Sequence, residues 1–117
     1  MMETPRTTIA VAGPAAEAQT AARTLRGVEG VEVGHVTGAS EEELLAQLSR
    51  TDLDALAFVT PVPDLAASIR RTLMANHHAL VIGPAALSAA QLVSLDELAR
   101  RRSRIVYVDA GYAEDQR

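Results

Sequence analysis

The sequence predicts an α/β fold, a three-layer sandwich with about five parallel strands and four helices. Short apolar runs alternate with segments of helical spacing from Thr7 onward. The runs are apolar at nearly every position, which is typical of parallel strands buried on both faces. Five such runs joined by four helical segments indicate an open sheet with helices on its faces.

The first strand, helix and second strand follow from turn signals and periodicity. Residues 8–12 form a continuous apolar run, which Gly13-Pro14 ends. Residues 15–25 carry alanine and leucine at helical spacing, and residues 31–36 form the second run after a glycine-containing turn. We therefore expect a strand, a helix and a strand.

The next three elements begin with a capping signal. Ser40 followed by Glu43 is a capping box, which predicts that a helix starts there and buries the leucines of residues 44–48. Residues 53–59 form the third apolar run, which is followed by a proline-rich turn. Residues 65–73 have apolar positions four apart and predict the third helix.

The last part of the chain repeats this alternation. Residues 78–82 form the fourth apolar run. Ser88 with Gln91 is a second capping box, so we expect the fourth helix to run from there to Arg102. Residues 105–108 form the fifth strand.

The composition excludes several classes of site. All 11 basic residues are arginine, and the chain has no cysteine. A Schiff-base lysine, a phosphate-binding lysine, a thiolate metal site and a cysteine nucleophile are therefore excluded within this chain. The net charge of −4 argues against nucleic-acid binding. No run approaches the ~20 apolar residues of a membrane span.

Composition also predicts the domain organisation. We expect residues 1–6 to be a disordered N-terminus, residues 7–112 to be one domain and residues 113–117 to be a C-terminal tail. The N-terminus does not read as a signal peptide. Together with the absence of cysteine, this predicts a cytoplasmic protein.

Residues 52–107 resemble the nucleotide-binding domain of the glucose–fructose oxidoreductase / inositol dehydrogenase (Gfo/Idh/MocA) family. The carriers are Thr60-Pro61 at a strand end, Pro84, the segment Ala86-Leu87-Ser88 and the helix "LDELARRR". The resemblance implies a Rossmann-like fold. With one helix between the second and third strands, the implied strand order is near 2-1-3-4-5. Response-regulator receivers share this order, but the acidic pair, aspartate and lysine that they need are absent.

The resemblance implies a dinucleotide site whose motifs are degenerate. Its cofactor-binding positions are Gly13, Ala15, Ala18, Gly38, Thr60 and Pro61. A Cβ at Ala15 impedes close approach of a pyrophosphate, Glu17 adds negative charge, and Gly38 lacks the ribose-binding carboxylate. The family's catalytic lysine corresponds to Gly83. We therefore expect no catalytic residue and no bound cofactor, with NAD(P) as the cofactor under the alternative function.

Other polar residues are candidates with ordinary structural explanations. His77 and His78 are adjacent, and neighbours on a strand point to opposite faces, so we expect no metal pair. His35 is expected to be half-buried. The arginines at 100–102 and Arg104 are candidates for an anion patch, but we expect a solvated surface on which they complement the C-terminus of their own helix. The remaining candidates for a small-ligand site follow strand ends: Thr60, Asp64, Asp109 and Tyr112.

The predicted topology leaves part of the sheet without a helix. Because parallel crossovers are right-handed, the first helix covers one face and the other three cover the opposite face. Too few residues follow Val108 for another covering helix. We expect an interface on the uncovered face that includes Phe58, Val81, Ile105 and Tyr107. A homodimer or a partner protein would cover it, with a total buried area on the order of 1,600 Å².

Three functions remain open from the sequence. The first is a non-catalytic Rossmann-like domain that acts through protein–protein contact as a scaffold, adaptor or oligomerisation module. The second is a weak nucleotide or small-anion sensor that uses the first glycine loop. The third is the NAD(P)-binding fragment of a larger Gfo/Idh/MocA-type oxidoreductase.

Overall fold

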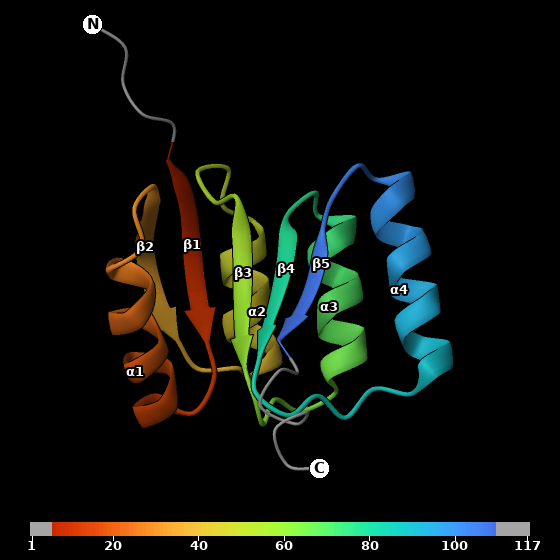
Figure 1. The fold of residues 1–117 in the computed structure, drawn as a ribbon, viewed down its shortest axis with the longest axis horizontal. Helices are drawn as coiled ribbons and strands as arrows, with labels where there is room; N and C mark the ends of the chain where they lie inside the picture. The colour runs from red at the N-terminus through yellow and green to blue at the C-terminus, as the bar shows by residue number, and fades with distance from the viewer. Residues whose placement is uncertain (1–5, 110–117) are drawn as a thin grey trace, which may run out of the picture.

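A computed structural model describes residues 6–109 and shows one parallel sheet of five strands with helices on both faces (Figure 1). The strand order is β2-β1-β3-β4-β5, as predicted. The elements in chain order are β1 Thr7–Ala12, α1 Ala15–Arg26, β2 Val31–Thr37, α2 Glu41–Leu48, β3 Ala55–Val59, α3 Leu65–Met74, β4 His78–Ile82, α4 Ala89–Arg101 and β5 Val106–Asp109.

Both predicted capping boxes are present. The Glu43 backbone N–H donates to Ser40 Oγ at 3.1 Å, and the Ser40 N–H donates to Glu43 Oε1 at 3.2 Å. Ser88 and Gln91 make the same reciprocal pair at the start of α4, at 3.1 and 2.8 Å. Each box satisfies two backbone donors that have no partner within the helix, so α2 and α4 begin where the sequence indicated.

Helices α2, α3 and α4 lie on one face of the sheet, which we call the covered face (Figure 1). Phe58, Leu56 and Val81 are fully buried there beneath Ile69 and Leu73 of α3. The predicted division of the helices between the two faces is confirmed. This face contains the larger part of the hydrophobic core.

Helix α1 lies alone on the opposite face, over the β1–β2 side of the sheet (Figure 1). Ala18 and Ala22 of α1 are fully buried against Val11 and Ala57 of the strands. Leu80 and the neighbouring Ile82 face this side but are only partly buried. We call the β4–β5 part of this side the uncovered face.

Four of the five predicted strands differ from the structure by one or two residues at a boundary, and β3 and β5 differ most. The structure starts β3 at Ala55 rather than at residue 53, since pairing with β1 begins with Ile9 opposite Ala55. Before Ala55, the Asp54 carboxylate accepts the Thr8 N–H at 2.8 Å. A side chain thus takes the place of the backbone carbonyl that a β3 strand would offer to β1 at this position. Strand β5 runs from Val106 to Asp109, one residue later than predicted. In the described part of the chain, no helix is long and apolar enough to cross a membrane.

Candidate functional site: an apolar groove beside α1

A groove with a volume of about 680 Å³ lies between α1 and β5. Its floor is formed by Val59, Leu80 and Ile82, and its far wall by Tyr107. Tyr107 is 57% exposed. We call this feature the apolar groove. It lies where a second helix would cover β4 and β5 on the face that α1 only half covers.

The near wall of the apolar groove is the flank of α1. Ala16, Thr20 and Thr24 recur at spacing four along it. The Thr20 hydroxyl donates to the Ala16 carbonyl at 3.0 Å, and the Thr24 hydroxyl donates to the Thr20 carbonyl at 3.3 Å. Because these hydroxyl protons are satisfied within the helix, the threonines present mainly methyl groups to the groove. Glu17 is the one charged side chain among the lining residues.

The residues predicted for an interface fall on two different faces. Ile105 and Tyr107 are exposed, at 63% and 57%, and Tyr107 lines the apolar groove. Phe58 and Val81 are fully buried in the core beneath α2, α3 and α4, so their assignment to the uncovered face is wrong. Successive strand residues point to opposite faces, and the β4 residues on the uncovered face are Leu80 and Ile82, which are partly buried.

The glycine loop after β1 is shaped by strand packing. A Cβ at Gly13 would collide with the carbonyl oxygen of Val59 and lie 2.9 Å from its Cβ. Pro14, which supplies no backbone N–H, stands at the N-cap of α1, and Ala15 follows as an exposed first residue of the helix. Ala18 is fully buried against the sheet. These residues fit a dinucleotide pyrophosphate poorly, because a donor is missing and a methyl group is added.

The end of β2 holds a carboxylate that the sequence reasoning missed. A Cβ on Gly38 would lie 2.5 Å from Glu43 Oε1, so the Glu43 carboxylate occupies the space beside this strand end. Hydrogen bonds from the Ser40 side chain and backbone lower the pKa of Glu43. The capping box places this carboxylate near Gly38. The box was recognised in the sequence, but its proximity to Gly38 was not.

The family's lysine position is closed in this chain. Gly83 has φ +103°, a conformation that L side chains rarely adopt. A Cβ at Gly83 would also lie 2.5 Å from Thr60 Oγ1. The Thr60 hydroxyl and backbone N–H both donate to the Ile82 carbonyl, at 3.3 and 3.0 Å, and the Thr60–Pro61 peptide bond is cis. Thr60 thus ties the ends of β3 and β4 together.

The two adjacent histidines line a polar pocket of about 450 Å³ at the amino ends of β3 and β4. His77 is buried, with Nδ1 2.8 Å from the Leu53 carbonyl and Nε2 3.2 Å from the Leu48 carbonyl. His78 Nδ1 accepts the Ile105 N–H at 3.1 Å. Burial first, and then the Arg104 charge, lower the pKa of His78. Both rings therefore connect chain segments.

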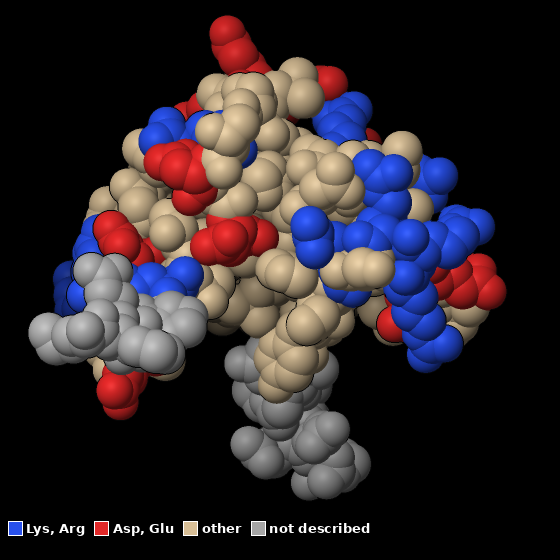
Figure 2. Space-filling model, turned by 90° about the horizontal axis from the view of Figure 1, so that it is seen from above, with Lys and Arg blue, Asp and Glu red and all other residues tan. Residues whose placement is uncertain are grey.

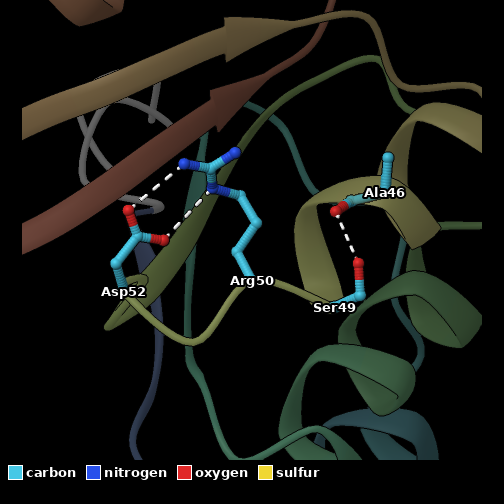
Figure 3. A network of polar contacts seen from close by, with 4 residues as sticks. All are labelled: Ala46, Ser49, Arg50 and Asp52. Atoms are coloured by element: carbon cyan, nitrogen blue, oxygen red, sulfur yellow. Dashed lines mark hydrogen bonds and ion pairs between the residues drawn. The ribbon is translucent and has the colours of Figure 1, made fainter.

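The loop between α2 and β3 borders the same polar pocket. Figure 3 shows Arg50 and Asp52 in a bidentate pair, with two N···O distances of 3.2 Å, and the Ser49 hydroxyl bonded to the Ala46 carbonyl at 2.9 Å. The hydrogen bonds from Arg50 lower the pKa of Asp52. These contacts order the turn before β3.

The arginines after α4 serve the C-terminus of the neighbouring helix. Figure 2 shows basic side chains gathered on the side of the molecule where α4 lies. Arg102 donates to the Met74 carbonyl at 2.6 Å, and Arg104 donates to the Asn76 carbonyl at 2.8 Å. They satisfy carbonyl groups at the end of α3, and their charge complements that helix's negative end.

The other sequence candidates are not brought together. Asp64 stands at the N-cap of α3 in a left-handed conformation, without a side-chain cap bond. His35 is half-buried on β2, as expected. Asp109 ends β5, but its side chain and Tyr112 lie outside the described part of the chain. No group of three or more His, Cys, Asp or Glu residues within 6–109 could hold a metal ion.

Comparisons with known proteins agree on the fold. No protein-family model matches the chain. No curated protein matches it either. Among solved structures, an NAD-binding protein from Listeria innocua matches 90% of this chain with a TM-score of 0.80 and 16% identity. A 3-ketoreductase from Actinomadura kijaniata, solved with NADP, matches 86% with a TM-score of 0.74 and 24% identity. The homoserine dehydrogenase of S. aureus matches 92% with a TM-score of 0.69 and 14% identity.

This similarity shows a Rossmann-like fold shared with an NAD-binding protein and a ketoreductase, as the resemblance in the sequence predicted. The chain spans only about a third of the length of these structures, at 34%, 37% and 33%. At these identities, the similarity is one of fold.

Proposed function

We propose that the protein is a non-catalytic, cytoplasmic Rossmann-like domain, spanning residues 7–112, that acts through protein–protein contact as an oligomerisation module. The observation that carries this function is the apolar groove. Its floor and far wall present Leu80, Ile82 and Tyr107 to solvent within the described residues. Proteins seldom leave contiguous apolar surface of more than a few hundred Å² exposed unless it is a site of interaction.

The proposed partner is a second copy of this chain, in a homodimer. Tyr107 lines the groove on the edge strand β5, and Ile105, which directly precedes that strand, is also exposed. A stable contact of this kind buries about 800 Å² on each partner. Aromatic side chains contribute much of the affinity in such contacts, and Tyr107 is the aromatic residue that lines the groove.

The absence of catalysis in this proposal rests on the chain's own chemistry. Neither lysine nor cysteine occurs in the sequence. Gly83, at the family's lysine position, has a backbone conformation that disfavours any side chain. These features support a pseudoenzyme in which the scaffold serves as a contact surface.

Light scattering after gel filtration tests the homodimer directly. We expect a mass of twice 12.4 kDa at micromolar concentration. A monomer that persists at 100 μM would overturn the homodimer. Formation of a stable complex only with a different protein would also overturn the homodimer.

A second candidate is the NAD(P)-binding domain of a longer oxidoreductase, in which the remaining chain covers the apolar groove. The fold shared with NAD-binding and NADP-bound structures favours it. The Glu43 carboxylate beside Gly38 also favours it, because dinucleotide sites hold an acidic group near this strand end. A weak nucleotide or anion sensor would use the same loop.

Calorimetric titration with NAD and NADP separates these candidates. We expect dissociation constants weaker than about 10 μM, an affinity that corresponds to roughly 7 kcal/mol of binding free energy. The reason is that Pro14 and Ala15 weaken contact with the pyrophosphate. Tighter binding of either nucleotide would favour the second candidate. The parent reading frame gives the matching genetic test: codons that continue past Arg117 into a substrate domain would identify a fragment.

A further inference from the structure

We propose that, in the homodimer, each copy places its α1 in the apolar groove of the other, so that two α1 helices form one layer between two sheets. This inference rests on the homodimer proposed above and specifies how the second copy binds. It assigns α1 a second contact surface in addition to the one that packs on its own sheet.

The space beside α1 has the dimensions of one helix. The floor and far wall of the apolar groove together span β3, β4 and β5, which are neighbours in the sheet. Two strand spacings amount to about 10 Å. Helices packed side by side are 8–10 Å apart. A single helix from the partner therefore fills the groove in the same layer as the resident α1.

The outward surface of α1 suits it for burial in that position. A surface helix normally has charged or polar residues opposite its buried stripe. In α1 the buried stripe is Ala18 and Ala22, and the exposed positions on the groove side include Ala16, Thr20 and Thr24. Small side chains let helices and sheets approach closely. The two threonine hydroxyls already donate to carbonyls of α1 itself, so their burial leaves no unpaired donor.

The long polar residues of α1 lie on its other flank. At 100° per residue, Gln19 and Arg26 project away from the apolar groove, Arg23 lies about 60° from Thr20 at the border of the outward surface, and none of the three lines the groove. An α1 helix in the partner's groove keeps these side chains within reach of the rim, where they remain solvated. Its groove-side flank then faces the groove-side flank of the resident α1.

Two-fold symmetry doubles this contact. Helix and groove lie side by side on the same face of each copy, so one face-to-face arrangement fills both grooves at once. Such a self-complementary contact closes as a dimer and does not propagate into a filament. Each copy contributes a helix surface and a groove, which brings the contact toward the size of a stable interface.

Glu17 provides a test of the arrangement through repulsion between like charges. It is the one charged side chain lining the apolar groove, and two-fold symmetry brings both copies' Glu17 into the shared helix layer. Like charges that are partly desolvated together oppose association. We expect Glu17→Gln to tighten the homodimer at least threefold, measured as the dissociation constant by sedimentation equilibrium.

Disulfide trapping tests the exchange directly, because the chain contains no cysteine. A Thr20→Cys preparation is mixed with a Leu80→Cys preparation and oxidised, so that only trans pairs of the two sites form the mixed product. We expect this product at least ten times faster than from Thr20→Cys mixed with Leu92→Cys, whose cysteine lies on α4. Equal rates in a sample that light scattering shows to be dimeric would overturn the helix exchange and leave the homodimer standing. A monomeric sample would overturn both.

A matched pair of charge variants provides a second readout. Thr20→Glu adds a carboxylate on the groove side of α1, and Gln19→Glu adds the same charge on the opposite flank. We expect the dimer dissociation constant to rise at least thirtyfold for the first and less than threefold for the second. Circular dichroism of each variant checks that α1 stays folded. Equal effects of the two charges would contradict the proposed orientation of α1.

Discussion

The two faces of the sheet differ in what covers them, although the same strands build both. On the covered face, Phe58 and Val81 are fully buried beneath three helices. On the other side, α1 covers β1 and β2, and Leu80 and Ile82 of β4 remain partly accessible. One strand therefore has a core side and a side that we propose as the contact surface. Stability should depend mainly on the first, and association on the second.

The largest expected effect is on the covered face. Phe58→Ala removes a fully buried aromatic ring and should lower the free energy of unfolding by about 3–5 kcal/mol. Chemical denaturation measures this loss. A cost below about 1 kcal/mol would show that the covered face can collapse around the deletion and does not dominate stability.

Tyr107→Ala is the matching change on the contact side. The side chain is 57% exposed, so we expect the free energy of unfolding of the monomer to change by no more than about 0.5 kcal/mol. The dimer dissociation constant should rise at least about thirtyfold, corresponding to about 2 kcal/mol for an aromatic residue that anchors the contact. Concentration-dependent sedimentation separates the two effects. Equal losses in both quantities would remove the contrast between the faces.

Gly83→Lys tests the junction where β3 and β4 end. The φ of +103° and the contact with Thr60 Oγ1 should cost about 1–3 kcal/mol of stability. Gly83→Ala is the control, since it introduces the same Cβ without the amine and should cost nearly as much. We expect neither variant to oxidise polyols or sugars with NAD or NADP. Turnover by Gly83→Lys alone would show that the lysine position can still support catalysis.

The smallest effect concerns pH and the other end of β4. Burial and Arg104 hold the pKa of His78 below its ordinary value of 6.5. As the pH falls below about 6.5, the unfolded chain therefore takes up protons before the folded chain does. The stability from neutral His78 is present above that pH and is lost as the pH falls through the lowered pKa. Thermal unfolding between pH 8 and pH 5 should show a shallower decline for His78→Asn than for the natural chain.

Much of the fold could be predicted because its signals are local. The order of elements, both capping boxes and the division of helices between the faces followed from short motifs and from crossover handedness. The assignment of Phe58 and Val81 failed for a physical reason. The strand that contains Phe58 is apolar at all five positions, so no alternation indicates which side chains point to which face.

The candidate site was less accessible to sequence reasoning because it depends on distant neighbours. Ile105 and Tyr107 were placed correctly on an exposed surface, since a strand at the sheet edge has few covering partners. The Thr20 and Thr24 stripe of α1 was missed, because its apolar character depends on hydroxyl bonds within the helix. The Glu43 carboxylate beside Gly38 was missed for a similar reason. It requires the geometry of the turn between β2 and α2.

Helix α2 is fastened mainly at its two ends. It has eight residues and a single buried side chain, Leu44. The Ser40–Glu43 pair holds its start, and the His77 ring reaches the Leu48 carbonyl at its end. Such a helix should open as one cooperative unit, with amide hydrogens that exchange well before those of α3. Since the same ring also lies against the Leu53 carbonyl, each opening of α2 would loosen the approach to β3.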